Sequence, residues 1–214
     1  MQRHAIRVQL VDDHAVVRAG YRAVLDGAHD IIVVAEAENG EVACRAYTEY
    51  RPQVVIMDWS LPGISGLEVT RRILARDVSA QILIFSMHQE TAFVEQALRA
   101  GARGYITKCS APEVLLEAVR QVAAGKTYLE KEIAHQLAIH RVQGHSAPLE
   151  VLTAREFEIF CLLAQGLGVN QIAKRLSLSY KTIANYSTQI KSKLEVNTVA
   201  ELTRLAIRHG VLKP

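Results

Sequence analysis

The 214-residue sequence has few cysteines and no long apolar run, and these absences narrow its class. Its three cysteines, Cys44, Cys109 and Cys161, are odd in number, widely separated and without CxxC spacing, which argues against disulfides and zinc sites. No apolar run approaches the roughly 20 residues that a membrane-spanning helix needs. Residues 1–14 are polar and then acidic, unlike a signal peptide. We therefore expect a reduced, cytoplasmic protein with no membrane association.

The charge is unevenly divided along the chain. The net charge is +3, but residues 1–130 hold 14 lysines and arginines against 16 acidic residues, and residues 131–214 hold 11 against 6. Within the second part, residues 151–214 hold 9 against 4 and carry the whole positive excess. An acidic N-terminal part and a basic C-terminal part predict two domains, with any polyanionic partner bound by the second.

The first 125 residues alternate between two periodicities. Short β-branched runs predict strands, and amphipathic segments between them predict helices. A strand followed by a helix, repeated five times, predicts a five-stranded parallel sheet with helices on both faces. The strands are expected at Ile6–Val11, Ile31–Ala35, Val54–Met57, Gln81–Phe85 and Gly104–Ile106, and the helices near Ala15–Asp26, Gly40–Tyr50, Gly66–Ala75, Thr91–Ala100 and Pro112–Ala124.

Chemically useful side chains follow four of these strands. The pair Asp12 and Asp13 ends the first strand, Asp58 the third and Ser86 the fourth, and the fifth leads to Lys108. Ligands bind at the carboxyl ends of parallel strands, so these side chains should converge. Crowded carboxylates favour Mg²⁺, and a carboxylate can accept a phosphoryl group while a lysine neutralises the developing charge. The simpler alternative makes the acidic pair a turn or helix cap and Lys108 a solvated charge; it explains each residue singly but not the set.

After residue 125 the pattern changes to helices alone. A helix is expected near Leu129–His140, followed by a loop at Gln143–Pro148. Four helices are then expected near Ala154–Gln165, Val169–Leu176, Tyr180–Leu194 and Thr198–His209, with Ser179 capping the third. This order predicts a helix-turn-helix, in which Lys181, Lys191 and Lys193 attract phosphates and Asn185, Thr188 and Gln189 face base edges. The alternative is a small helical bundle with solvated lysines.

The front of the chain resembles a two-component receiver domain over about residues 5–125. The resemblance is carried by LVDDH (10–14), MDWSLPGISGLE (57–68), IFSM (84–87) and GYITK (104–108). It implies a flavodoxin-like doubly wound fold with Asp58 as phosphoacceptor. Asp13, Asp58 and the backbone carbonyl of Ser60 would bind Mg²⁺, and Asp12 would act through metal-bound water. Lys108 would pair with the phosphoryl group, Ser86 would hydrogen-bond it and Tyr105 would rotate during the switch. Trp59 departs from the pattern, because an aliphatic residue usually follows the phosphoacceptor.

The back of the chain resembles the LuxR-type helix-turn-helix of NarL/FixJ-class response regulators. LTAREFEI, LAQGLGVNQIAKRLSLSYKTIANY and KLEV carry this resemblance. It implies that Tyr180–Leu194 is the recognition helix, with Lys181 and Thr182 near phosphates and Ala184, Asn185 and Thr188 facing bases; Lys191 is a further candidate contact. Lysine is common at the position of Ala184, so a relative's operator sequence does not transfer to this chain.

Together these features predict a phosphorylation-controlled transcription regulator, not an enzyme. We expect a receiver domain at 1–125, a partly helical linker at 126–149 and a DNA-binding domain at 150–214. The expected partners are a sensor histidine kinase, double-stranded DNA and a second copy of the chain once phosphorylated. Two alternatives stay open: a hydrolase with Asp58 as covalent nucleophile, although such enzymes usually carry DxD on the first strand, and a receiver that signals without phosphate.

Overall fold

The computed structural model describes residues 5–142 and 148–212. The chain divides into two compact units, one formed by residues 1–89 and 97–131 and the other by residues 90–96 and 132–214. Residues 143–147 of the expected linker lie outside the described residues. Each unit is described by itself below.

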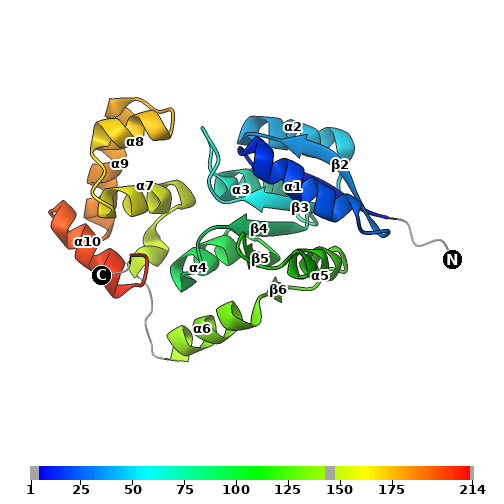
Figure 1. The fold of residues 1–214 in the computed structure, drawn as a ribbon. Coiled ribbons are helices and arrows are strands. Elements are labelled where there is room, and N and C mark those ends of the chain that lie inside the picture. Colours follow the sequence, from blue (N-terminus) through cyan, green and yellow to red (C-terminus); the bar gives the residue numbers. More distant parts are fainter. Residues whose placement is uncertain (1–4, 143–147, 213–214) are drawn as a thin grey trace. The chain divides into compact units, whose positions relative to one another are not determined.

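The first unit is a parallel sheet with helices on both faces, as the alternating pattern predicts (Figure 1). The strand order is β2-β1-β3-β4-β5-β6, which is the flavodoxin-like order with one strand added at the edge. The added strand β6 is only two residues long, too short for any periodicity, and it pairs with Gly104 and Tyr105. The strands are β1 (Ile6–Val11), β2 (Ile31–Ala37), β3 (Val54–Asp58), β4 (Ile82–Ser86), β5 (Gly104–Thr107) and β6 (Tyr128–Leu129), and the helices are α1 (Ala15–Asp26), α2 (Gly40–Tyr50), α3 (Gly66–Arg76) and α5 (Pro112–Ala123). The boundary between the units falls within α4 (Thr91–Arg99), whose residues 91–96 belong to the second.

Alternation along the central strand β1 decides which helices cover which face. Leu10 points into one core, which it shares with Leu25 of α1 and Leu115 of α5. Its neighbour Gln9 points the other way and donates a hydrogen bond from Nε2 to the carbonyl of Ala43 in α2. Helices α1 and α5 therefore cover one face, and α2, which packs on α3, covers the other. Since both faces are covered, the carboxyl ends of the strands are the edge at which polar side chains can meet.

The second unit contains the helices expected at the end of the chain. They are α6 (Lys131–Val142), the short 3₁₀ helix η1 (Pro148–Val151), α7 (Ala154–Ala164), α8 (Val169–Arg175), α9 (Tyr180–Lys193) and α10 (Val199–Arg208). The Ser179 side chain accepts a hydrogen bond from the backbone N–H of Thr182, so the predicted cap of α9 is confirmed. Ile183 of α9 and Leu202 of α10 are fully buried, and both helices pack on α7. Among the described residues, no helix is both long and apolar enough to cross a membrane.

Candidate functional site

Two carboxylates and one ammonium meet at the carboxyl ends of β1, β3 and β5. The Lys108 Nζ atom lies 2.6 Å from Asp12 Oδ2 and 2.8 Å from Asp58 Oδ2. Asp12 is 1% exposed and Asp58 4% exposed, so both carboxylates are shielded from water. The structure thus brings together three of the side chains that follow successive strands in the sequence.

Burial and pairing act in opposite directions on these groups. Burial raises the pKa of Asp58 to about 6, and the nearby Lys108 ammonium only partly opposes this shift. Burial lowers the pKa of Lys108, but the combined attraction of Asp58 and Asp12 outweighs it and leaves that pKa raised. At neutral pH the pocket therefore holds a charged lysine beside a largely ionised Asp58.

Asp13 and His14 complete a compact set of donor atoms around this pocket. Asp12, Asp13, His14 and Asp58 each offer a ligand atom, and these atoms lie within 4.8 Å of one another. The Nδ1 atom of His14 is 2.8 Å from Asp13 Oδ1, and its backbone N–H donates to Asp12 Oδ1. Carboxylate oxygens are the donors that Mg²⁺ prefers, so the acidic members of this set fit that ion. In the sequence, His14 is marked only by its position directly after the acidic pair.

The loop after β3 is packed tightly against the carboxylate of Asp58. The backbone N–H of Ser60 donates to Asp58 Oδ1 at 3.3 Å, and the Trp59 side chain is 3% exposed, in keeping with ordinary core packing. A Cβ atom at Gly66 would lie 1.9 Å from the carbonyl oxygen of Asp58. Only glycine therefore fits at this helix start, because any side chain would overlap the backbone that carries Asp58.

Ser86 and Tyr105 are buried on neighbouring strands and are joined through one residue. The Ser86 hydroxyl oxygen accepts a hydrogen bond from the backbone N–H of His88, and the Tyr105 hydroxyl donates to the backbone carbonyl of His88 at 2.8 Å. Because both side chains hold the same backbone segment, a change at one can alter the hydrogen bond of the other.

Two further groups, missed by sequence reasoning, hold the segment that carries Lys108. The Tyr21 hydroxyl of α1 donates to the backbone carbonyl of Lys108 at 3.1 Å. On the other side, Glu130 Oε1 accepts hydrogen bonds from the Thr107 backbone N–H at 2.7 Å and from the Ser110 hydroxyl at 2.6 Å. Glu130 follows the two-residue strand β6, so no periodic pattern marked it.

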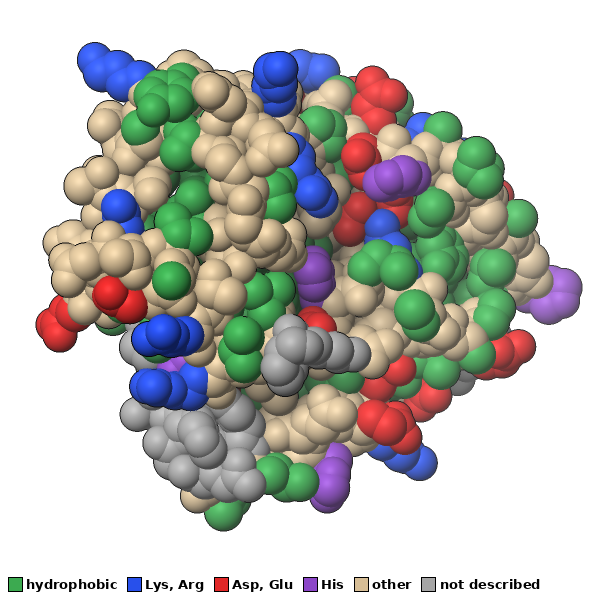
Figure 2. Space-filling view, turned by 60° about the vertical axis from the view of Figure 1, so that its left-hand side comes forward, with side chains coloured by type: hydrophobic (Ala, Val, Ile, Leu, Met, Phe, Trp, Pro, Cys, Tyr) green, Lys and Arg blue, Asp and Glu red, His purple; other side chains and the backbone are tan. Residues whose placement is uncertain are grey.

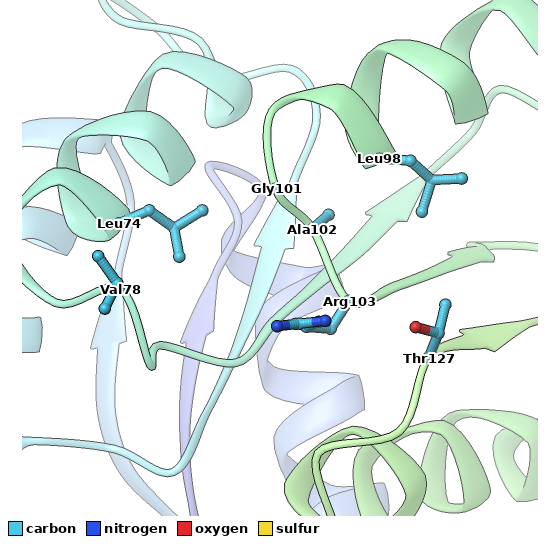
Figure 3. A pocket seen from close by; sticks show the side chains of 7 residues that line it. All are labelled: Leu74, Val78, Leu98, Gly101, Ala102, Arg103 and Thr127. Atoms are coloured by element: carbon cyan, nitrogen blue, oxygen red, sulfur yellow. The ribbon is translucent and has the colours of Figure 1, made fainter.

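A separate pocket of about 270 Å³ lies away from the acidic cluster. Its lining residues include Val78, Arg103 and Thr127, which precede β4, β5 and β6, so it lies at the amino ends of these strands (Figure 3). Arg103 is the one ionisable side chain in its lining. This pocket therefore lacks the paired acids that phosphoryl or metal chemistry needs.

In the second unit, the predicted nucleic-acid contacts lie on α9 with different exposures. Lys181, Asn185 and Thr188 are exposed, whereas Thr182, Ala184 and Lys191 are partly buried. Thr182 is also engaged at the helix start, where its hydroxyl is 2.8 Å from the Ser179 hydroxyl.

Lys193 has a structural contact that its position in a basic helix did not reveal. Its Nζ lies 2.7 Å from Glu156, a buried carboxylate in the capping box of α7. The exposed Lys193 ammonium is therefore already paired with a carboxylate of the same unit, and Lys181 and Lys191 are the α9 lysines without such a partner among the described residues. On the face in Figure 2, lysine and arginine side chains lie singly or in small groups and do not form one continuous patch.

Comparison with known proteins gives two family matches. A model described as the response regulator receiver domain matches residues 8–120, and one described as bacterial regulatory proteins, luxR family, matches residues 150–206. The chain is 47% identical over 209 residues to the transcriptional activator protein ExaE of Pseudomonas putida, covering 96% of this chain and 98% of that protein. It is 39% identical over 208 residues to the response regulator UvrY of Escherichia coli strain K12, covering 96% and 95%.

A solved structure gives the same result at lower identity. RcsB from Salmonella enterica serovar Typhimurium, bound to promoter P1flhDC in the presence of phosphomimetic BeF3⁻, aligns with a TM-score of 0.68 and 26% identity. The alignment covers 94% of this chain and 98% of that chain.

Proposed function

Because this chain belongs to the NarL/FixJ-type two-component response regulators, with a receiver domain and a LuxR-type DNA-binding domain, we propose that phosphorylation of Asp58 controls its dimerisation and DNA binding. The phosphoryl donor is a sensor histidine kinase. The observation that carries the proposal is the contact of Lys108 with both Asp58 and Asp12 in a buried pocket. We propose that the protein acts in the cytoplasm, where its kinase and chromosomal DNA are both accessible.

The carboxylate of Asp58 is suited to attack phosphorus. Its Oδ2 atom forms the new bond to phosphorus while the bond from phosphorus to the imidazole nitrogen of the kinase histidine breaks. A pKa of about 6 leaves Asp58 largely ionised at neutral pH, so the nucleophile is available without a general base. Lys108 Nζ, already 2.8 Å from Oδ2, balances the negative charge on the phosphoryl oxygens.

Asp12, Asp13 and Asp58, together with the carbonyl of Ser60, would hold the Mg²⁺ that this chemistry needs. When bound, this ion supplies positive charge that draws the phosphoryl oxygens toward the acidic pocket. The cluster of oxygen donors within 4.8 Å supports this assignment. Asp12 cannot give both oxygens to a metal while it accepts hydrogen bonds from Lys108 and the His14 N–H, which supports a role through bound water.

Ser86 and Tyr105 would convert the modification into a conformational change. A phosphoryl oxygen on Asp58 would accept a hydrogen bond from the Ser86 hydroxyl, and turning the Ser86 side chain toward it takes the hydroxyl oxygen away from the His88 N–H, which now donates to that oxygen. Loss of that bond frees the backbone segment that Tyr105 also holds. The two-state element is therefore the segment at His88, and the phosphoryl group biases it.

The proposal is tested by treating the full chain with a small phosphodonor and Mg²⁺ and measuring its mass. We expect one phosphoryl adduct in the wild type and none in Asp58→Ala. Beryllofluoride with Mg²⁺ should then promote dimerisation and DNA binding in the wild type alone. Steady Asp58-dependent release of phosphate over many turnovers would favour the hydrolase alternative, and the absence of an adduct would favour a receiver that works without phosphate.

The DNA-binding part of the proposal has its own test. Lys181 is exposed at the first turn of α9 and should neutralise one phosphate. Lys181→Ala should reduce the slope of log affinity against log salt concentration by about 0.9. An unchanged slope would refute a phosphate contact at this residue.

A further inference from the structure

The bases that α9 can read follow from the composition of its exposed face, if the proposed DNA-binding function holds. Lys181, Asn185, Thr188, Gln189 and Ser192 are exposed and fall at spacings that place them on one side of the helix. A helix seated in the major groove presents such a face to the base edges. After Lys181, this face consists of two amides and two hydroxyls.

No positive charge lies in the middle of the helix. Residues 182–190 contain no charged residue, and α9 contains no arginine and no acidic residue. Its lysines lie in the first and last turns, and Lys193 is paired with Glu156. Guanine is read in the major groove chiefly by arginine or lysine, which donate two hydrogen bonds to O6 and N7. The centre of α9 has no arginine or lysine that could bind guanine in this way.

The centre of α9 carries two side-chain amides that are available to a ligand. Among the described residues, neither Asn185 nor Gln189 forms a side-chain hydrogen bond. A side-chain amide matches adenine, because it donates to N7 and accepts from the N6 amino group. The two residues are four positions apart, which separates them by about 6 Å along the axis, close to two base-pair steps.

The residues around the two amides can contact thymine, the base that pairs with adenine. A shallow hollow of about 250 Å³ on α9 is lined by Thr182, Asn185, Tyr186 and Gln189. Tyr186 brings an aromatic ring to this hollow, and the Thr188 hydroxyl is turned to the Ala184 carbonyl. An aromatic ring and a threonine methyl are apolar surfaces that can contact the thymine methyl group.

We propose that Asn185 and Gln189 each read an adenine, so that the part of the half-site facing α9 consists of A·T pairs with no required guanine. Asn185 and Gln189 set the sequence preference, whereas Lys181 and Lys191 supply affinity common to all sequences.

The test begins by finding a bound sequence. The full-length protein, treated with beryllofluoride and Mg²⁺, is used to select from duplexes with a randomised central segment. The selected duplex is then remade with 7-deaza-adenine at one adenine at a time, which removes the N7 acceptor but keeps the pairing with thymine. Fluorescence anisotropy gives the affinity of the wild type and of Asn185→Ala and Gln189→Ala for each duplex.

We expect selected half-sites to share two adenines at which 7-deaza-adenine weakens wild-type binding several-fold. Asn185→Ala should weaken binding to the selected duplex roughly 5- to 150-fold and lose sensitivity at one of these adenines only, and Gln189→Ala at the other only. Asn197→Ala removes an exposed amide outside α9 and should leave both sensitivities intact. Unchanged thermal unfolding of both α9 variants would show that they fold.

Three results would overturn the inference. These are half-sites whose shared positions facing α9 are G·C pairs, insensitivity to 7-deaza-adenine at every position, and variants that keep the full wild-type pattern. If selection yields no duplex bound above random competitor DNA, the proposed DNA-binding function fails as well. Selection of a specific duplex without the adenine pattern overturns the inference alone.

Discussion

Replacing Asp58 by asparagine should make the protein more stable at neutral pH in the absence of divalent cations. The substitution keeps the size of the side chain but removes one negative charge from a pocket in which Lys108 faces both Asp58 and Asp12. Asp58 is 4% exposed, so water does little to stabilise its ionised form. In the apo protein its charge therefore opposes folding.

The size of the effect follows from the pKa of Asp58. Folding raises this pKa from 3.8 to about 6, and ionising the folded protein at pH 7.5 then costs up to about 3 kcal/mol. Because the folded-state pKa is the higher one, protonation of Asp58 stabilises the folded protein. This contribution to the free energy of unfolding is complete below pH 3.8 and is lost as the pH rises through about 6. In Asp58→Asn, Lys108 loses one of its two carboxylate partners, and this loss offsets part of the stabilisation. We expect a net stabilisation of about 1–3 kcal/mol at pH 7.5.

The assay is urea unfolding of the wild type and Asp58→Asn between pH 4 and pH 8, with a metal chelator present. Trp59 is the single tryptophan of the chain, is buried and adjoins Asp58, so its fluorescence reports unfolding of this unit. The wild type should lose stability relative to the variant as the pH rises through the interval from 3.8 to about 6. Equal stability at pH 7.5, or parallel pH profiles for the two proteins, would refute the reasoning.

Two further substitutions test the packing and pairing of each unit. Gly66→Ala should cost at least about 3 kcal/mol, because its Cβ would overlap the Asp58 carbonyl oxygen, whereas Gly20→Ala, in open space on α1, should gain about 0.5–1 kcal/mol. Similar thermal midpoints for the two alanine variants would contradict this. Lys193→Ala should cost about 1–2 kcal/mol, since it leaves the buried carboxylate of Glu156 without its ammonium partner. Lys193 lowers the pKa of Glu156 against burial, so the loss should shrink as the pH falls below 4.5; a pH-independent loss would contradict the pairing.

The order of elements in the first unit could be predicted because each strand and helix has its own periodicity. The bounds of α1 and α2 coincide with the sequence expectation. β3 extends one residue further, to Asp58, and β4 is shifted by one residue, starting at Ile82 and ending at Ser86. The exception is β6, whose two residues give no repeat. Its place at the sheet edge depends on pairing with β5, which a local pattern does not encode.

The residues of the acidic pocket could be predicted from the sequence because they follow strands. The groups that hold this pocket in place could not be predicted. Asp12, Asp58 and Lys108 each adjoin a recognisable strand, so topology alone brings them together. Tyr21 contacts a residue 87 positions away along the chain, and Glu130 contacts residues 20 and 23 positions away. Neither follows one of the strands that the sequence predicts. The role of Lys193 was hidden for the same reason, because its partner lies on another helix.

The contact of Glu130 with Thr107 and Ser110 also sets a rule for exchanging DNA-binding domains between relatives. The carboxylate that secures the segment carrying Lys108 is the last residue before α6. A chimera joined before Glu130 would replace the residue that holds the segment carrying Lys108, even though the strands β1 to β5 stay intact. Junctions placed within α6 should preserve signalling competence, and insertions between β6 and α6 should not.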